Sequence, residues 1–168
     1  MPATQRGATN VGVALALSVS LSAAILILTT ITPLQHWREA LTITKQLTRI
    51  TEAATLSYQK DVMQSRCLTQ TGSMTLNRLI NEQRLPIDIN QDLWTFDVKL
   101  IDLTINTWTR PSQIQTTVTF LSRADLQAVI DNLPAGHLDN LTLTVSTPLR
   151  IDITDNWAHF NKQTGCYE

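Results

Sequence analysis

Hydrophobic residues follow two different patterns in the first part of the chain. From Val11 to Ile31 the residues are apolar or small, none is charged, and no polar face recurs at helical spacing. A helix needs about 20 such residues to cross the hydrocarbon core of a bilayer. A helix that packs on a globular domain of this size usually keeps a polar face. The run therefore predicts a transmembrane helix over residues 11–32, after a short tail over residues 1–10.

The alternative for this run is a cleaved signal peptide, which has an apolar core of roughly 7–15 residues and then a small-residue cleavage site. The candidate site, at Ser22 to Ala24, is followed by a further apolar stretch from Ile25 to Leu28. No cysteine follows that would mark a lipoprotein. A retained anchor is the favoured interpretation.

The second pattern begins after Pro33, and no Gly or Pro occurs from His36 to Arg66. This segment predicts a stalk helix over residues 33–66. Its apolar stripe, with spacings of 4, 3 and 4, consists of Ile43, Leu47, Ile50 and Ala54. The stripe has two interpretations, which are packing on the helix's own domain and a coiled coil that would make it a partner stripe.

Apolar and polar residues then alternate, which predicts strands with one buried face. The alternation runs from Trp94 to Leu100, where its phase flips and a β-bulge would restore the facing. It resumes from Ile114 to Phe120. The two segments predict an antiparallel hairpin with its turn at residues 110–112.

A short helix is predicted before each pair of strands. Before the first pair, Ser73 is the expected cap of a helix that ends near Pro86. After the first pair, Ser122 with Asp125 resembles a capping box at the start of a second helix. The helix after Ser122 has an apolar stripe at positions i, i+3, i+4 and i+7, made of Leu126, Val129, Ile130 and Leu133.

Two more strands are predicted, from Leu141 to Val145 and from Leu149 to Ile153. The order helix, strand, strand, helix, strand, strand lets both helices bury their stripes on one face of a sheet. The predicted fold class is α+β. A transmembrane helix and a stalk helix precede a ferredoxin-like αββαββ sandwich over residues 67–168, with four antiparallel strands and two helices on one face.

The two cysteines, Cys67 and Cys166, lie before the first domain helix and after the last strand. In the unpermuted ferredoxin-like order that strand runs directly into that helix, so the cysteines are expected close together and paired. Two unrelated free thiols are the alternative, because sequence does not establish pairing. A disulfide would place the domain in an oxidising compartment such as the periplasm. The charges that flank the apolar run slightly favour the opposite orientation.

Composition adds no chemistry to this picture. The net charge is −1, and the scattered Lys and Arg lack the basic footprint of a nucleic-acid-binding protein. His36, His137 and His159 lack the spacing of metal ligands. No phosphate-binding loop or nucleophile motif occurs. We therefore expect no catalytic residue, metal, cofactor, small-molecule substrate or nucleic acid.

The whole layout resembles the bitopic inner-membrane proteins of the type IV pilus and type II secretion assembly platform, which are PilO-like and GspM-like. The most similar stretch runs from Ile114 to Val145 and comprises a strand, the helix after Ser122 and a further strand. The resemblance implies a short cytoplasmic N-terminus and a bacterial inner-membrane anchor. It also implies a periplasmic domain that pairs with homologous or like-fold membrane proteins, as a homodimer or heterodimer.

The N-terminus also resembles type IV pilins and pseudopilins. Arg6 and Gly7 are similar to the basic-Gly site of the prepilin peptidase, which implies cleavage between Gly7 and Ala8. Pilins usually carry Glu five residues after the cut, where this chain has Gly12. The expected function is a non-catalytic scaffold of a pilus or secretion machine. A minor pilin is the first alternative, and a membrane-tethered periplasmic sensor or accessory domain is the second.

Overall fold

The computed structural model describes residues 5–69, 72–90, 93–105, 107–150 and 159–167, apart from the side chains of residues 5–12 and 23–32. The chain is α+β and divides into two compact units, residues 1–39 and 40–168. Helix α1 (Gln5–Ser65) contributes residues to both units.

The first unit consists of the beginning of α1, with Pro33 inside the helix. The described apolar side chains of residues 13–22 are exposed, and Leu17 and Leu21 are each 66% exposed. Within the described part of the chain, no helix combines the length and the apolar character needed to span a membrane. The predicted run from Val11 to Ile31 lies in α1, but the side chains of residues 11, 12 and 23–31 lie outside the described residues.

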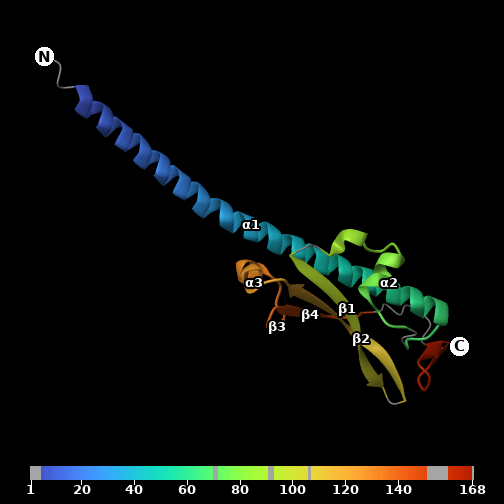
Figure 1. The fold of residues 1–168 in the computed structure, drawn as a ribbon. Coiled ribbons are helices and arrows are strands. Elements are labelled where there is room, and N and C mark those ends of the chain that lie inside the picture. The colour runs from blue at the N-terminus through green and yellow to red at the C-terminus, as the bar shows by residue number, and fades with distance from the viewer. Residues whose placement is uncertain (1–4, 70–71, 91–92, 106, 151–158, 168) are drawn as a thin grey trace. The chain divides into compact units, whose positions relative to one another are not determined.

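The second unit is built around a four-stranded antiparallel sheet in the order β1-β2-β4-β3 (Figure 1). Its strands are β1 (Trp94–Ile105), β2 (Trp108–Phe120), β3 (His137–Asp139) and β4 (Thr142–Pro148). The predicted alternation is confirmed in β1, where Trp94, Phe96 and Val98 are buried and the residues between them are exposed. One face of the sheet therefore belongs to the core.

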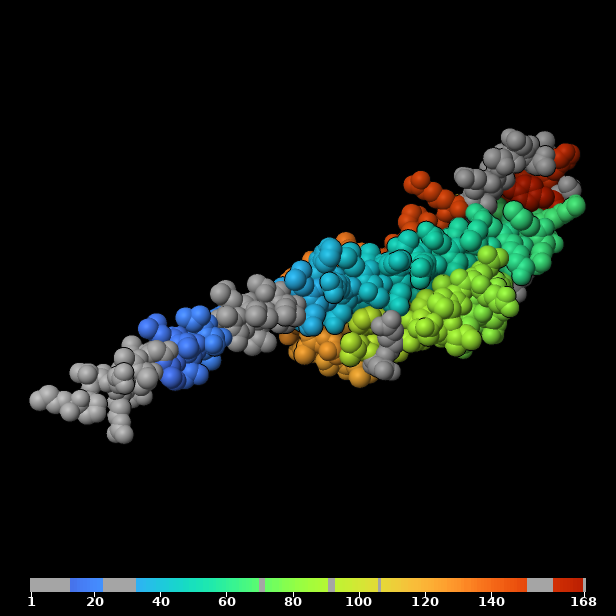
Figure 2. Space-filling view, turned by 90° about the horizontal axis from the view of Figure 1, so that it is seen from above, coloured from blue at the N-terminus to red at the C-terminus, as the bar shows by residue number. Residues whose placement is uncertain are grey.

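Helices cover that face. They are residues 40–65 of α1, α2 (Leu76–Asn81) and α3 (Arg123–Val129), with the 3-10 turns η1 (Ile87–Ile89) and η2 (Ile130–Asn132). Buried side chains from the three helices, η1 and strands β1, β2 and β4 form one hydrophobic core. Residues 40–65 of α1 and the segment from α2 to η1 lie side by side (Figure 2). Because α2 has only 6 residues, α1 supplies most of the helical layer.

The predicted β1–β2 hairpin is confirmed, but its predicted turn is wrong. Ile105 pairs with Trp108, so the connection lies at residues 106–107. The predicted bulge is present, since Ile101 pairs with Gln113 and the next residue pairs with Pro111. The bulge interrupts the ladder, and β2 therefore accommodates a proline that would otherwise remove a ladder hydrogen bond.

The second hairpin also differs from the prediction. The strand predicted from Leu141 to Val145 corresponds to β4, but its partner β3 precedes it rather than follows it. The two-residue connection begins at Asn140, whose φ of +52° is a conformation that Asn tolerates well. Of the strand predicted at residues 149–153, residues 149 and 150 are not in a strand, and the rest lies outside the described residues.

Hydrogen bonds at the N-termini of α3 and α2 test the two caps predicted from the sequence. The Ser122 hydroxyl accepts a hydrogen bond from the backbone N–H of Asp125 and donates one to Asp125 Oδ2, at 3.2 and 2.7 Å. This confirms Ser122 as the N-cap of α3, and the Asp125 carboxylate bonds to the Ser122 hydroxyl rather than to the backbone N–H that a capping box uses. The cap of α2 is Thr75, not Ser73, because the Thr75 hydroxyl accepts from the Arg78 N–H at 3.2 Å.

Candidate functional site

A polar network joins α1 to the end of α2. The Glu82 carboxylate accepts hydrogen bonds from the Ser57 hydroxyl at 2.9 Å and from Nε of Arg78 and Arg84 at 3.1 Å each. Arg78 also pairs with Asp61 of α1, with Nη2 and Oδ1 2.5 Å apart. These contacts fix the turn after α2 against α1.

The hydrogen bonds of this network stabilise the charged forms of Glu82 and Arg78. Burial alone would raise the pKa of the Glu82 carboxyl, but hydrogen bonds from Ser57, Arg78 and Arg84 outweigh burial and lower the pKa to about 2. The pKa of Arg78 is raised, first of all by its hydrogen bond to Asp61. Glu82 and Arg78 therefore stay ionised at neutral pH, where they hold the turn rather than exchange protons.

A groove of about 540 Å³ lies beside this network, between α1 and the segment that follows α2. Its apolar lining includes Ala53 and Leu85, which are buried, and Leu56, which is 52% exposed. Its polar lining consists of Arg49, Glu52, Glu82, Gln83 and Arg84. A lining that combines apolar residues with charges of both signs suits a protein side chain better than a small charged substrate.

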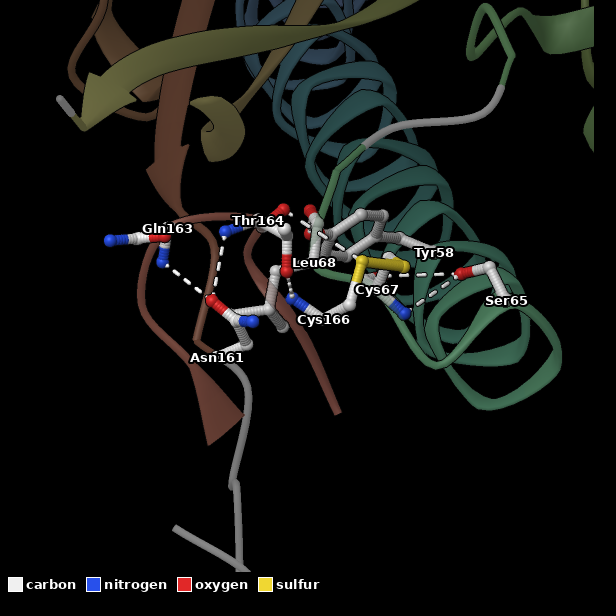
Figure 3. The surroundings of a disulfide bond; sticks show 8 residues. All are labelled: Tyr58, Ser65, Cys67, Leu68, Asn161, Gln163, Thr164 and Cys166. Atoms are coloured by element: carbon white, nitrogen blue, oxygen red, sulfur yellow. Dashed lines mark hydrogen bonds between the residues drawn. A yellow bond between two sulfur atoms is a disulfide. The ribbon is translucent and has the colours of Figure 1, made fainter. Parts of the chain in front are cut away.

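The predicted Cys67–Cys166 disulfide is present (Figure 3). It joins the residues that follow α1 to a small C-terminal hairpin of β5 (Phe160–Asn161) and β6 (Cys166–Tyr167). Backbone hydrogen bonds support it on both sides, from Leu68 N–H to the Gly165 carbonyl at 2.9 Å and from Tyr167 N–H to the Arg66 carbonyl at 2.7 Å. The C-terminal hairpin is thus attached to the end of α1.

Tyr58 reinforces this attachment from within the core. Its hydroxyl donates a hydrogen bond to the Leu68 carbonyl (Figure 3). The side chain is fully buried, and burial is the main cause that raises the Tyr58 pKa to about 12. The hydroxyl therefore remains a donor throughout the physiological pH range, and it positions the residue next to Cys67.

An aromatic contact holds the other side of the hairpin. The Trp108 indole N–H donates to the Lys162 carbonyl at 3.0 Å, and the Trp108 and Phe160 ring centroids are 6.0 Å apart. Gly165 has φ +74°, and a Cβ there would approach the Trp108 ring to 2.5 Å. Only glycine satisfies both the backbone conformation and this close approach.

The stripe at Ile43, Leu47, Ile50 and Ala54 is buried, with exposed fractions from 0% to 5%. All four residues belong to the core that α1 shares with the sheet. They are therefore not available as a partner stripe, because they are already buried within that core. Of the two interpretations, packing on the helix's own domain agrees with the structure.

The predicted peptidase site lies near the beginning of α1. Gly7 and Ala8 lie in α1, but their side chains are outside the described residues. In the part of the chain that the structure describes, no group of three His, Cys, Asp or Glu side chains could hold a metal ion.

Sequence reasoning missed the network around Glu82. A signal was present in α1, because the buried stripe continues one turn beyond Ala54 to Ser57 and Tyr58, and both are fully buried. Polar groups on a core face need hydrogen-bonding partners. That requirement predicts polar side chains on the segment packed there, but it does not identify Glu82.

Searches of family models, curated proteins and solved structures found no match to this chain.

Proposed function

We propose that this protein is a non-catalytic, membrane-anchored scaffold of a type IV pilus or type II secretion-like machine. In this proposal the apolar N-terminal run anchors the chain in the bacterial inner membrane as a single-pass protein. Residues 40–168 then form a periplasmic domain that pairs with like domains. The order of elements in the second unit is the observation that carries the proposal.

The sheet order supports a ferredoxin-like αββαββ domain. If the first strand of a ferredoxin-like βαββαβ chain is moved to the end of the chain, it becomes strand 4. In the sheet it then lies between strands 2 and 3, counted along the permuted chain. The order becomes 1-2-4-3, which is the order of β1-β2-β4-β3. Helix α3 connects the two hairpins, and the helices share one core with the sheet.

The composition of the apolar run supports the membrane anchor. It lacks charge, and its described serines satisfy their hydroxyls within the helix. Ser20 donates to the Ala16 carbonyl and Ser22 to the Ser18 carbonyl, each at 2.8 Å. Internal hydrogen bonds of this kind reduce the cost of placing a hydroxyl in lipid, where no water is available.

The disulfide supports the periplasmic side, because disulfides persist in oxidising compartments. The test of the proposal is membrane fractionation of the full chain, followed by mass measurement of its N-terminus. Retention in carbonate-washed membranes with an intact Met1 agrees with a platform component. Recovery of the chain in the soluble fraction, with residues up to about Ala24 removed, would contradict the anchor.

A minor pilin or pseudopilin is the second candidate, and one observation favours it. Helix α1 runs without interruption from Gln5 to Ser65, and its residues 40–65 pack on the sheet. A single helix that starts at the peptidase site and continues into the sheet domain is the arrangement that the pilin resemblance implies. A mature N-terminus at Ala8 would select this candidate over the platform component.

A further inference from the structure

The two edges of the four-stranded sheet differ in length. Among the described residues, β3 forms one edge and has only 3 residues, whereas β1 forms the other edge and has 12. Short edge strands resist pairing with other chains, and long ones invite it unless charge, proline or a covering segment protects them. The edge of β1 therefore needs protection along its length.

The odd-numbered residues of β1 bond to β2, and the even-numbered residues direct their backbone groups away from the sheet. Leu121 N–H donates to the carbonyl of Leu93, the residue before β1, at 3.1 Å, and Ile105 closes the two-residue connection to β2. The bulge adds its extra residue to β2, so this phase holds along the whole of β1. In agreement with it, the Phe96 N–H points outward and donates to the Asn90 side chain at 2.8 Å.

Asn90 protects the first half of this edge, but the second half is open. Of the outward-pointing residues there, Asp102 and Thr104 are exposed, and their backbone groups form no hydrogen bond with another described residue. The residues that alternate with them are apolar and share one face, namely Ile101, Leu103 and Ile105, and Leu103 is 48% exposed. Residues 101–105, which we call the distal edge, thus combine an open row of backbone groups with an apolar face.

An open row of N–H and C=O groups is satisfied by another extended strand. The side chains decide which strand fits. That strand must place apolar residues opposite the three apolar residues of the distal edge. It must also keep negative charge away from Asp102, because like charges directly opposite each other are destabilising. A second copy of the distal edge meets both conditions when it runs antiparallel with Leu103 opposite Leu103.

In that register every apolar residue acquires an apolar partner, because Ile101 of each copy lies opposite Ile105 of the other. Asp102 lies opposite Thr104 of the second copy, and the two residues exchange both backbone hydrogen bonds. The neighbouring registers fit less well. A two-fold axis at Asp102 would oppose two aspartates, and one at Thr104 would place Ile101 opposite the polar Thr107.

We infer that two copies of this chain pair through the distal edge, about a two-fold axis at Leu103, into one continuous sheet. Such an isologous contact closes on itself, so it covers both open edges and stops at a dimer. This inference rests on the proposed function for its setting, an assembly of like domains. It names the strand and the register through which they pair.

The first test introduces single cysteines into the full chain in membranes and oxidises them with copper phenanthroline. Cys67 and Cys166 are already paired, so they do not compete with the introduced thiol. Leu103→Cys places two Cβ atoms about 4.5–5.5 Å apart, close to the separation in a disulfide, and should give a linked dimer. Thr104→Cys is the matched control, since it is adjacent and exposed but does not face its own copy, and it should link at least about tenfold more slowly.

A mixed experiment fixes the register. Co-expressed chains that carry Ile101→Cys and Ile105→Cys should cross-link with each other, whereas either variant alone should give little dimer. If Leu103→Cys gave no linked dimer, or linked no faster than Thr104→Cys, the distal edge would be overturned as an interface.

Thr104→Pro tests the backbone hydrogen bonds. It removes an outward N–H and spares the β1–β2 ladder, which is where a strand tolerates proline. Analytical ultracentrifugation in detergent micelles should show dimerisation weakened by about thirtyfold, because each copy loses one donor. The control is Thr109→Pro, since Thr109 is exposed and pairs with Thr104 in the same hairpin but lies on β2. This control should dimerise like the unaltered protein, and an equal loss in both variants would count against the inference.

Failure of this interface is distinguishable from failure of the proposed function. A monomer retained in carbonate-washed membranes overturns the distal edge as an interface and leaves the membrane scaffold standing. A dimer that is linked through Leu103→Cys but recovered in the soluble fraction supports the interface and contradicts the anchor.

Discussion

Two parts of α1 use apolar residues in different ways. In residues 13–22, Val13, Leu15, Leu17, Val19 and Leu21 are all 59–66% exposed. In residues 40–65, Ile43, Ile50 and Ala54 are 0% exposed. The apolar residues of the first part recur at every second position, so they point to more than one side of the helix. Those of the second part recur at every third or fourth position, so they lie on one face. Spacing, rather than hydrophobicity alone, determines which part a sheet can bury.

The largest effect is expected from a substitution in the buried part of α1, residues 40–65. Ile50→Ala removes a fully buried side chain from the core between α1 and the sheet. Such truncations cost about 2–5 kcal/mol, and we expect a value near 4 kcal/mol. The measurement is urea unfolding in detergent followed by tryptophan fluorescence. Leu17→Ala, in the other part of α1, should change the free energy of unfolding by less than about 0.5 kcal/mol. Equal effects of the two variants would contradict the comparison.

The disulfide belongs to the buried side of this comparison, because it attaches the C-terminal hairpin to the end of α1. It joins residues separated by 99 positions, and removing it with the double substitution Cys67→Ser and Cys166→Ser should cost about 3 kcal/mol. The same unfolding assay without reductant measures the loss. Adding reductant to the unaltered protein should reproduce it, and should leave the double variant unchanged. If reductant destabilised both proteins equally, the loss would have another cause.

A charge in the exposed apolar part tests the other side of the comparison. Leu17→Arg places a guanidinium in the middle of the run, which costs about 2.5–3.5 kcal/mol for insertion of a helix into a membrane. We expect a larger share of the chain in the carbonate-soluble fraction. The control is Met63→Arg, because Met63 is 78% exposed in the other part of α1. Membrane retention that is insensitive to Leu17→Arg would argue against the anchor.

The smallest effect concerns the network that holds the turn after α2 against α1. The pKa of Glu82 is lowered to about 2 in the folded protein, so the unfolded chain binds the proton more tightly. Its stabilisation is therefore complete above the unfolded pKa and is lost as the pH falls from about 5 toward 2. Because the carboxylate lies near solvent, we expect only about 1 kcal/mol. Glu82→Gln should remove this pH dependence, and unfolding curves at pH 7, 4 and 2.5 would test it. An equal slope in both proteins would contradict the assignment.

The sequence predicted elements whose signals are local. The alternation in β1, the buried Leu126 and Val129 of α3 and the Ser122 N-cap each depend on neighbouring residues, and the structure contains all three. Pro111 misled the prediction of the turn because a bulge, which depends on the facing strand, accommodates it within β2. Strand β3 was missed because three exposed residues carry no alternation.

The candidate site was less predictable. The cysteine pair was found from the order of the elements, and the stripe of α1 was found from its spacing. Spacing does not say whether a stripe faces the chain's own sheet or a partner. The groove depends on how the segment after α2 packs on α1, which no pattern in the sequence encodes.

The central claim is that the N-terminal run stays in the membrane while Cys67 and Cys166 are paired on its oxidising side. The most direct test is gel-shift labelling of the thiols in intact cells with a bulky, membrane-impermeant maleimide. The account predicts no shift before reduction and a shift by two labels after treatment with a membrane-impermeant reductant. Two thiols that remain unlabelled until the cells are lysed, and then react without reductant, would contradict it.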